Sequence, residues 1–71
     1  MNTQEIEILA MKAMGHSFME IYKTLLLNPM VVERHWNTRV PEKELEETVQ
    51  RLVDVGIKDL RKPARSEGIR G

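Results

Sequence analysis

The fold is decided by residues 15–35, which read GHSFMEIYKTLLLNPMVVERH. Gly15 is a natural helix stop, because glycine adopts the left-handed backbone conformation without strain. Ser17 and Glu20 have the spacing of a capping box, in which a hydroxyl and a carboxylate each accept a hydrogen bond from a backbone amide. Asn28 is a strong helix cap, and a proline follows it at the favoured first helical position. These signals predict two short helices joined by a tight turn.

The residues before this stretch also have a helical pattern. Asn2 and Glu5 have the spacing of a second capping box, which predicts a helix from about position 3 to position 14. Its expected core stripe recurs at i, i+3, i+4 and i+7 and consists of Ile6, Leu9, Ala10 and Ala13. Ile8 and Met11 lie off that stripe, so we expect them either to widen it or to contact a partner.

The two helices of the quoted stretch have different expected ends. The helix that starts at Ser17 is expected to end near Leu26, and its apolar face consists of Phe18, Ile21, Tyr22 and Leu25. The helix that starts at Asn28 is expected to continue to about Arg39, because the residue before Pro41 avoids the helical backbone conformation.

A fourth helix is predicted after Pro41, with a buried seam of Leu45, Val49 and Leu52. Gly56 is its expected stop, with Ile57 folding back onto the core. Residues 63–71 have too little apolar content to pack, so they are predicted to form a flexible basic tail. We therefore predict an all-α, four-helix helix-turn-helix domain over residues 1–62, followed by that tail.

Composition limits the possible classes of function. The chain has 71 residues, no cysteine and no net charge. The lack of cysteine excludes disulfides and thiolate metal sites and is typical of a reducing compartment, so we expect a cytoplasmic protein. No apolar run is long enough to span a membrane, and we expect neither a signal peptide nor a membrane partner. The sequence has no nucleophile–base set, no phosphate loop and no metal-ligand spacing, so we expect neither an enzyme nor a bound cofactor or metal.

The charges are unevenly distributed along the chain. Residues 41–54 are acidic overall, residues 55–71 are basic, and residues 29–40 have a slight positive excess. A neutral total weakens the prediction of nucleic-acid binding, but the separation of charge keeps that prediction open. The candidates for phosphate contacts near the C-terminal end are Arg61, Lys62 and Arg65.

One family pattern extends over residues 5–39 without a gap. The matching positions are Glu5, Ile8, Leu9, Ala13, Gly15, Ser17, Glu20, Ile21, Leu25, Leu27, Asn28, Val32 and His35. In this pattern the chain resembles the LuxR-type (GerE-like) helix-turn-helix of bacterial transcription regulators. The resemblance implies that the helix at about 29–39 enters the major groove of duplex DNA, and that the next helix pairs two subunits.

By position, the resemblance implies that Met30, Arg34 and Asn37 face bases. Arginine and asparagine suit that role, since each can bond two atoms on one base edge. The residues expected to hold phosphates are Ser17, Arg39, Arg61, Lys62 and Arg65. The expected function is a small DNA-binding transcriptional regulator that acts as a homodimer.

Three residues depart from the family pattern and keep an alternative open. Tyr22 replaces a small residue where the two helices approach, Glu33 replaces a lysine on the DNA face, and Val31 replaces a hydroxyl residue. Tyr22, Glu33 and the neutral net charge favour a helix-turn-helix fold that binds a protein partner through the acidic helix after Pro41, and so modulates the transcription machinery or another partner. Residues 45–71 are also similar to the last helix and wing of winged-helix domains, which makes a short C-terminal hairpin the alternative fold.

Overall fold

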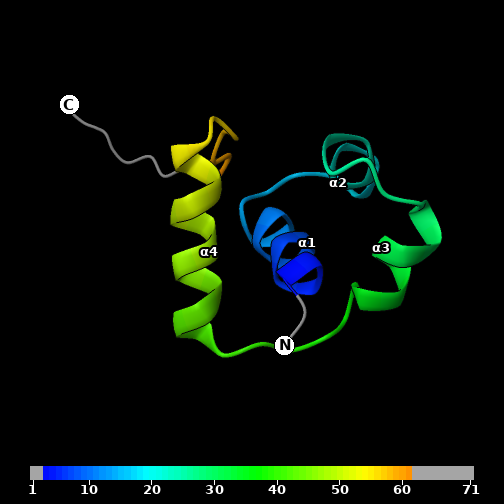
Figure 1. Ribbon diagram of the computed structural model, residues 1–71, viewed down its shortest axis with the longest axis horizontal. Coiled ribbons are helices and arrows are strands. Elements are labelled where there is room, and N and C mark those ends of the chain that lie inside the picture. The colour runs from blue at the N-terminus through cyan, green and yellow to red at the C-terminus, as the bar shows by residue number, and fades with distance from the viewer. Residues whose placement is uncertain (1–2, 62–71) are drawn as a thin grey trace.

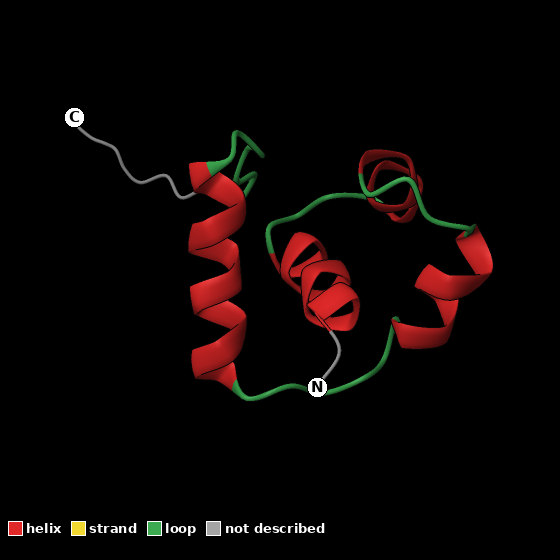
Figure 2. Ribbon diagram, in the orientation of Figure 1, coloured by secondary structure: helices red, strands yellow, loops and turns green. Residues whose placement is uncertain are grey.

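The helices are arranged around a central first helix. The computed structural model describes residues 3–61, in which the helices are α1 (Thr3–Ala13), α2 (Phe18–Thr24), α3 (Pro29–His35) and α4 (Glu42–Asp54). α4 packs along one side of α1, while α2 and α3 pack against its other side (Figure 1). Figure 2 shows only helices and loops over the described residues, so the prediction of an all-α fold is confirmed.

Part of the predicted organisation lies outside the described residues. The flexible tail predicted for residues 63–71 lies there, and so does Lys62. Residues 57–61 contain no strand of the hairpin predicted as the alternative fold. The rest of the segment expected to form that hairpin lies outside the described range. None of the helices within residues 3–61 has the length and apolar content needed to cross a membrane.

Both caps predicted for the quoted stretch are confirmed. Ser17 Oγ accepts from the amide of Glu20 at 3.2 Å, and Glu20 Oε1 accepts from the amide of Ser17 at 3.0 Å. Asn28 Oδ1 accepts from the amide of Met30 at 2.8 Å, with Pro29 in the first turn of α3. Helices of seven residues are marginal in isolation, so these caps and the packing on α1 together hold α2 and α3.

The turn between α2 and α3 contains a leucine in the left-handed backbone region. Leu26 has φ +58°, and the amide of Leu27 bonds to Tyr22 O at 2.9 Å, which is the hydrogen bond of a Schellman cap. This position favours glycine, because a Cβ there is crowded by the neighbouring carbonyl. The Leu26 side chain is also 89% exposed, so its burial does not offset the backbone strain.

Replacing this leucine with glycine is expected to stabilise the protein. Leu26→Gly should raise the free energy of unfolding by about 0.5–1 kcal/mol, because the relief of strain exceeds the extra entropy of the unfolded chain. Val55→Gly is the matched control, since Val55 is an exposed aliphatic residue at the end of α4 with φ −91°. Thermal unfolding should show a higher midpoint for Leu26→Gly only; a lower midpoint would contradict strain at this turn.

The core is built mainly from α1. The fully buried residues of this helix and its end include Ile8, Ala10, Met11 and Met14. The predicted stripe is therefore only partly right: Leu9 and Ala10 are buried, but Ile6 and Ala13 are half-buried. Ile8 and Met11 widen the buried face, because α1 has helices on two sides and must bury a broader arc than a helix at the edge of a bundle.

The other helices bury the faces that the sequence predicted. In α2, Ile21 is fully buried, and the rest of the expected face packs partly buried against the core. In α4, Val49 and Leu52 are buried and Leu45 is half-buried. These faces contact α1 from one side only, so a single helical stripe describes each of them.

The segment after α4 folds back onto the turn between α1 and α2. Gly56 has φ +106°, and the amide of Ile57 bonds to Leu52 O at 2.9 Å, so the predicted stop and return of the chain are confirmed. The amide of Leu60 then donates to Met14 O at 2.8 Å. This contact brings Leu60 close to Gly15, in the turn after α1. A Cβ added to Gly15 would lie only 3.2 Å from the Leu60 Cβ, so the position has little room for a side chain.

Candidate nucleic-acid interface

α3 has an exposed face opposite its buried one. Val32 is fully buried, and Trp36, directly after the helix, packs half-buried against the core. Met30 is 69% exposed and Arg34 is exposed, and these two residues lie four positions apart on the same helical face. The structure therefore places two of the three predicted base-facing residues on the outer surface of α3.

The predicted extension of this helix to Arg39 is wrong. α3 ends at His35, where the amide of Trp36 bonds to Glu33 O at 3.2 Å, three residues earlier. Hydrogen bonds of this type tighten the chain into turns instead of continuing the α-helix. Asn37 therefore lies in the turn after α3, and Arg39 lies in the connection to α4.

Three polar residues of α3 and of the segment after it have donors available for a ligand. Within residues 3–61, the side chains of Arg34, Asn37 and Arg39 form no hydrogen bond or ion pair, and all three are exposed. A guanidinium has five N–H donors and a carboxamide has two. These three side chains can therefore donate several hydrogen bonds to acceptors such as phosphates or base edges.

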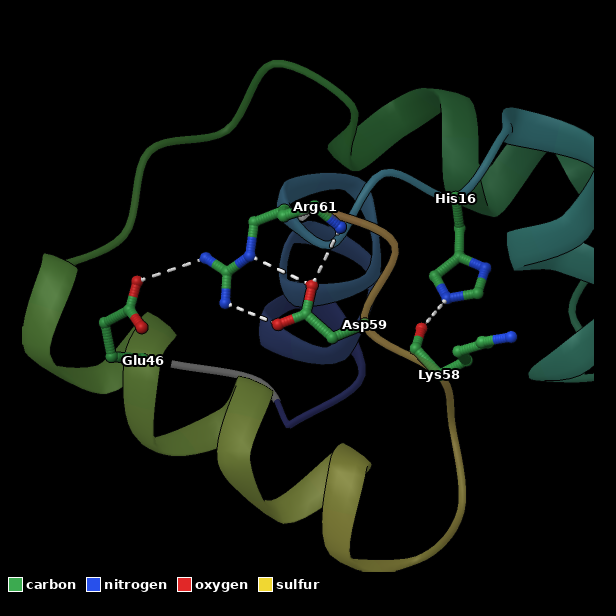
Figure 3. A network of polar contacts seen from close by, with 5 residues as sticks. All are labelled: His16, Glu46, Lys58, Asp59 and Arg61. Carbon is green, nitrogen blue, oxygen red and sulfur yellow. Dashed lines mark hydrogen bonds and ion pairs between the residues drawn. The ribbon is translucent and has the colours of Figure 1, made fainter. Parts of the chain in front are cut away.

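Arg61, predicted to hold phosphate, is instead engaged with two carboxylates. Its guanidinium donates to both oxygens of Asp59, at 3.1 and 2.9 Å, and lies 3.6 Å from the Glu46 carboxylate of α4 (Figure 3). The hydrogen bond that Arg61 donates to the Asp59 carboxylate raises the pKa of Arg61 above its ordinary value. The structure thus places Arg61 beside α4 and not with Arg34, while Lys62 and Arg65 lie outside the described residues.

The amide and the hydroxyl oxygen of Ser17 both form hydrogen bonds with Glu20 at the start of α2. Its amide donates to the Glu20 carboxylate, and this bond lowers the pKa of Glu20. His16 adds a second contact, with Nδ1 at 3.5 Å from the same carboxylate and Nε2 donating to Lys58 O at 2.6 Å (Figure 3). A phosphate approaching Ser17 would therefore meet the negative charge of Glu20 beside it.

A set of contacts that the sequence pattern did not reveal fixes the end of α3. Trp36 packs edge-on against Phe18, with ring centroids 5.4 Å apart. Lys12 Nζ donates to Trp36 O at 2.8 Å and lies 4.7 Å from the centroid of its ring. His35 Nδ1 lies 2.9 Å from the Glu5 carboxylate of α1. These partners are far apart in sequence, so no local spacing signals them.

The three departures from the family pattern have different structural settings. Tyr22 is half-buried and packs edge-on against Phe18 at 5.7 Å, so the phenol lies at the margin of the core. Val31 is half-buried and also packs against the core. Glu33 is exposed on α3 and its side chain forms no hydrogen bond or ion pair within residues 3–61, so its carboxylate reduces the positive charge of this surface.

The acidic helix lies on the far side of the molecule from this surface. Within the described range, the packing partner of α4 is α1, which lies between α4 and α3 (Figure 1). The exposed carboxylates of its first turns are Glu42, Glu44, Glu46 and Glu47. The tertiary structure therefore gives a chain without net charge an acidic side and a weakly basic side.

No cluster of three or more potential metal ligands occurs within residues 3–61. Comparisons of the chain with protein-family models, with curated proteins and with solved structures found no match.

Proposed function

We propose that the protein binds duplex DNA by placing the exposed face of α3 in the major groove, and that it regulates transcription in this way. The observation that carries the proposal is the set of uncommitted donors at Arg34, Asn37 and Arg39, next to a capped helix whose other face is buried. In this arrangement Met30 and Arg34 approach base edges, and Asn37 follows from the adjoining turn. An α-helix fits the width of the major groove, and arginine can pair bidentately with guanine.

The separation of charge supports the same orientation. α4 carries the excess of carboxylates, and α1 lies between it and α3. DNA on the α3 side would be repelled little by that negative charge, because salt screens exposed charges that are more than about 8–10 Å apart. Arg39 lies in the connection to α4, where it lines a pocket with Leu45, so it would contact phosphates at the edge of this surface. Arg61 contributes less because its charge is balanced by Asp59 and Glu46.

A binding experiment that follows individual amides tests this proposal. The labelled protein is titrated with a random-sequence duplex at about 50 mM and about 200 mM salt, a range over which phosphate contacts lose much of their affinity. Amide shifts centred on residues 29–39, with weaker binding at the higher salt, are the expected result. Shifts confined to residues 58–71, or no shifts at low salt, would contradict binding through α3.

A second candidate function is protein binding through α4. The specific observation in its favour is an exposed surface that combines the acidic residues of α4 with Val53 and Val55, which are 38% and 72% exposed. A basic partner with an apolar centre would complement such a surface. Pairing of two copies through α4 would instead bring like charges together, so a homodimer of this kind should become more stable as salt increases.

A further inference from the structure

A pocket between α1, the α3–α4 connection and α4 shares only Arg39 with the residues of the proposed function. It has a volume of about 510 Å³, within the range of small-molecule sites, and it is open to solvent on one side. Its lining comes from α1, from the connection between α3 and α4, and from α4. The lining residues are Leu9, Lys12, Ala13, Thr38, Arg39, Val40 and Leu45.

The walls of the pocket are apolar. Leu9 and Ala13 contribute from α1, Val40 from the connection and Leu45 from α4. Of these four residues only Leu9 is buried, and the other three are half-buried. The fold therefore leaves apolar surface from three segments partly uncovered at one place, where an apolar group could displace water favourably.

The polar side chains that line the pocket are either positively charged or uncharged. Lys12 and Arg39 line it together with the hydroxyl of Thr38, and no carboxylate does, although the chain has as many acidic residues as basic ones. Lys12 uses one donor on Trp36 O, and an ammonium group has two more. The Arg39 side chain forms no hydrogen bond or ion pair within residues 3–61.

This combination specifies the chemistry of a ligand. Two cations beside apolar walls complement a molecule that has an anionic head and an apolar body, and the guanidinium fork matches the two oxygens of a carboxylate. The contacts of Lys12 with the Trp36 carbonyl and ring hold its ammonium in place before any ligand arrives, which lowers the entropic cost of binding.

We propose that this pocket binds a small organic carboxylate with an apolar chain or ring, whose carboxylate pairs with Arg39 and Lys12. The apolar body lies against Leu9, Ala13 and Leu45. The inference rests on the lining of the pocket alone and does not depend on DNA binding by α3.

Octanoate is the probe for a direct test on the full chain. Its binding is followed by amide shifts and by the fluorescence of Trp36, the sole tryptophan of the sequence, whose ring lies next to Lys12. Saturable shifts at residues 9–13 and 38–45 are expected. Octanol lacks the charge, so it should bind at least about tenfold more weakly, the factor expected for losing one charge-assisted contact. Acetate lacks the apolar body and should also bind at least about tenfold more weakly, because each buried CH₂ contributes about 0.8 kcal/mol.

Two arginine variants distinguish specific binding in the pocket from non-specific binding of octanoate. Arg39→Gln should weaken octanoate binding by about tenfold, whereas Arg51→Gln should leave it unchanged, because Arg51 is an exposed arginine of α4 that does not line the pocket. Absence of saturation, equal binding of octanol, or an unaltered Arg39→Gln variant would overturn the proposal.

Discussion

Ile8→Ala is expected to leave the protein largely unfolded at room temperature, while Ile6→Ala leaves it folded. Ile8 is fully buried at the centre of the core, and truncating such a residue to alanine costs about 2–5 kcal/mol. A domain of this size without disulfides or metal rarely has more than about 3–5 kcal/mol of stability in total. The cost of this one substitution is therefore as large as the whole free energy that separates the folded chain from the unfolded one.

The two isoleucines form a matched pair for this measurement. Both lie in α1 and both lose the same atoms, so the change in helix propensity is the same. Ile6 is half-buried, and its truncation should cost only about 1 kcal/mol from the smaller apolar area returned to water. Circular dichroism without denaturant shows whether Ile8→Ala keeps its helices, and urea unfolding measures the cost at Ile6 and, where a folded baseline remains, at Ile8. Equal costs, or a larger cost at Ile6, would contradict the packing of helices on two sides of α1.

Arg34→Ala is expected to weaken binding to a preferred duplex by about 1–3 kcal/mol, a loss of roughly 5- to 150-fold, if α3 reads DNA as proposed. Arg34 is exposed on the outer face of α3, and within residues 3–61 its guanidinium forms no hydrogen bond or ion pair. The substitution therefore removes contacts to DNA without removing contacts that hold the fold. Fluorescence anisotropy with a labelled duplex, at two salt concentrations, gives the affinity and its salt dependence.

The neighbouring carboxylate gives a prediction of opposite sign. Glu33→Gln removes a negative charge from the same exposed surface, so it should strengthen DNA binding, and more so at low salt. Arg51→Ala, on the acidic helix, is the control for a general effect of charge and should change little. If Arg34→Ala left both the affinity and the salt dependence unaltered, α3 would not be the element that contacts DNA.

The caps show how far the sequence determines the local structure. A hydroxyl and a carboxylate three residues apart can satisfy only the amides beside them, so Ser17 and Glu20 define the start of α2 whatever packs nearby. The same is true of Asn28 at α3 and of Gly56 after α4. These contacts join residues a few positions apart, and for that reason the starts of α2 and α3, the end of α4 and the all-α class could be predicted.

Burial and charge pairing were decided by the tertiary structure. Ile8 and Met11 are buried because α1 lies between α4 and the α2–α3 pair, which no periodicity within α1 reveals. α3 ends at His35, four residues earlier than predicted, as the chain tightens at Trp36, which Phe18 and Lys12 fix from other helices.

The candidate site divides in the same way. The sequence shows that Arg34 and Asn37 are residue types suited to DNA. It does not show which basic side chains form ion pairs within the protein and which have no partner. Arg61 is paired with Asp59 and Glu46, whereas Arg39 is uncommitted within the described residues and lines a pocket. The sequence by itself determined where α2 and α3 begin, because capping is local. Only the tertiary structure decided which side chains are buried, paired or available, because those outcomes depend on residues that are distant along the chain.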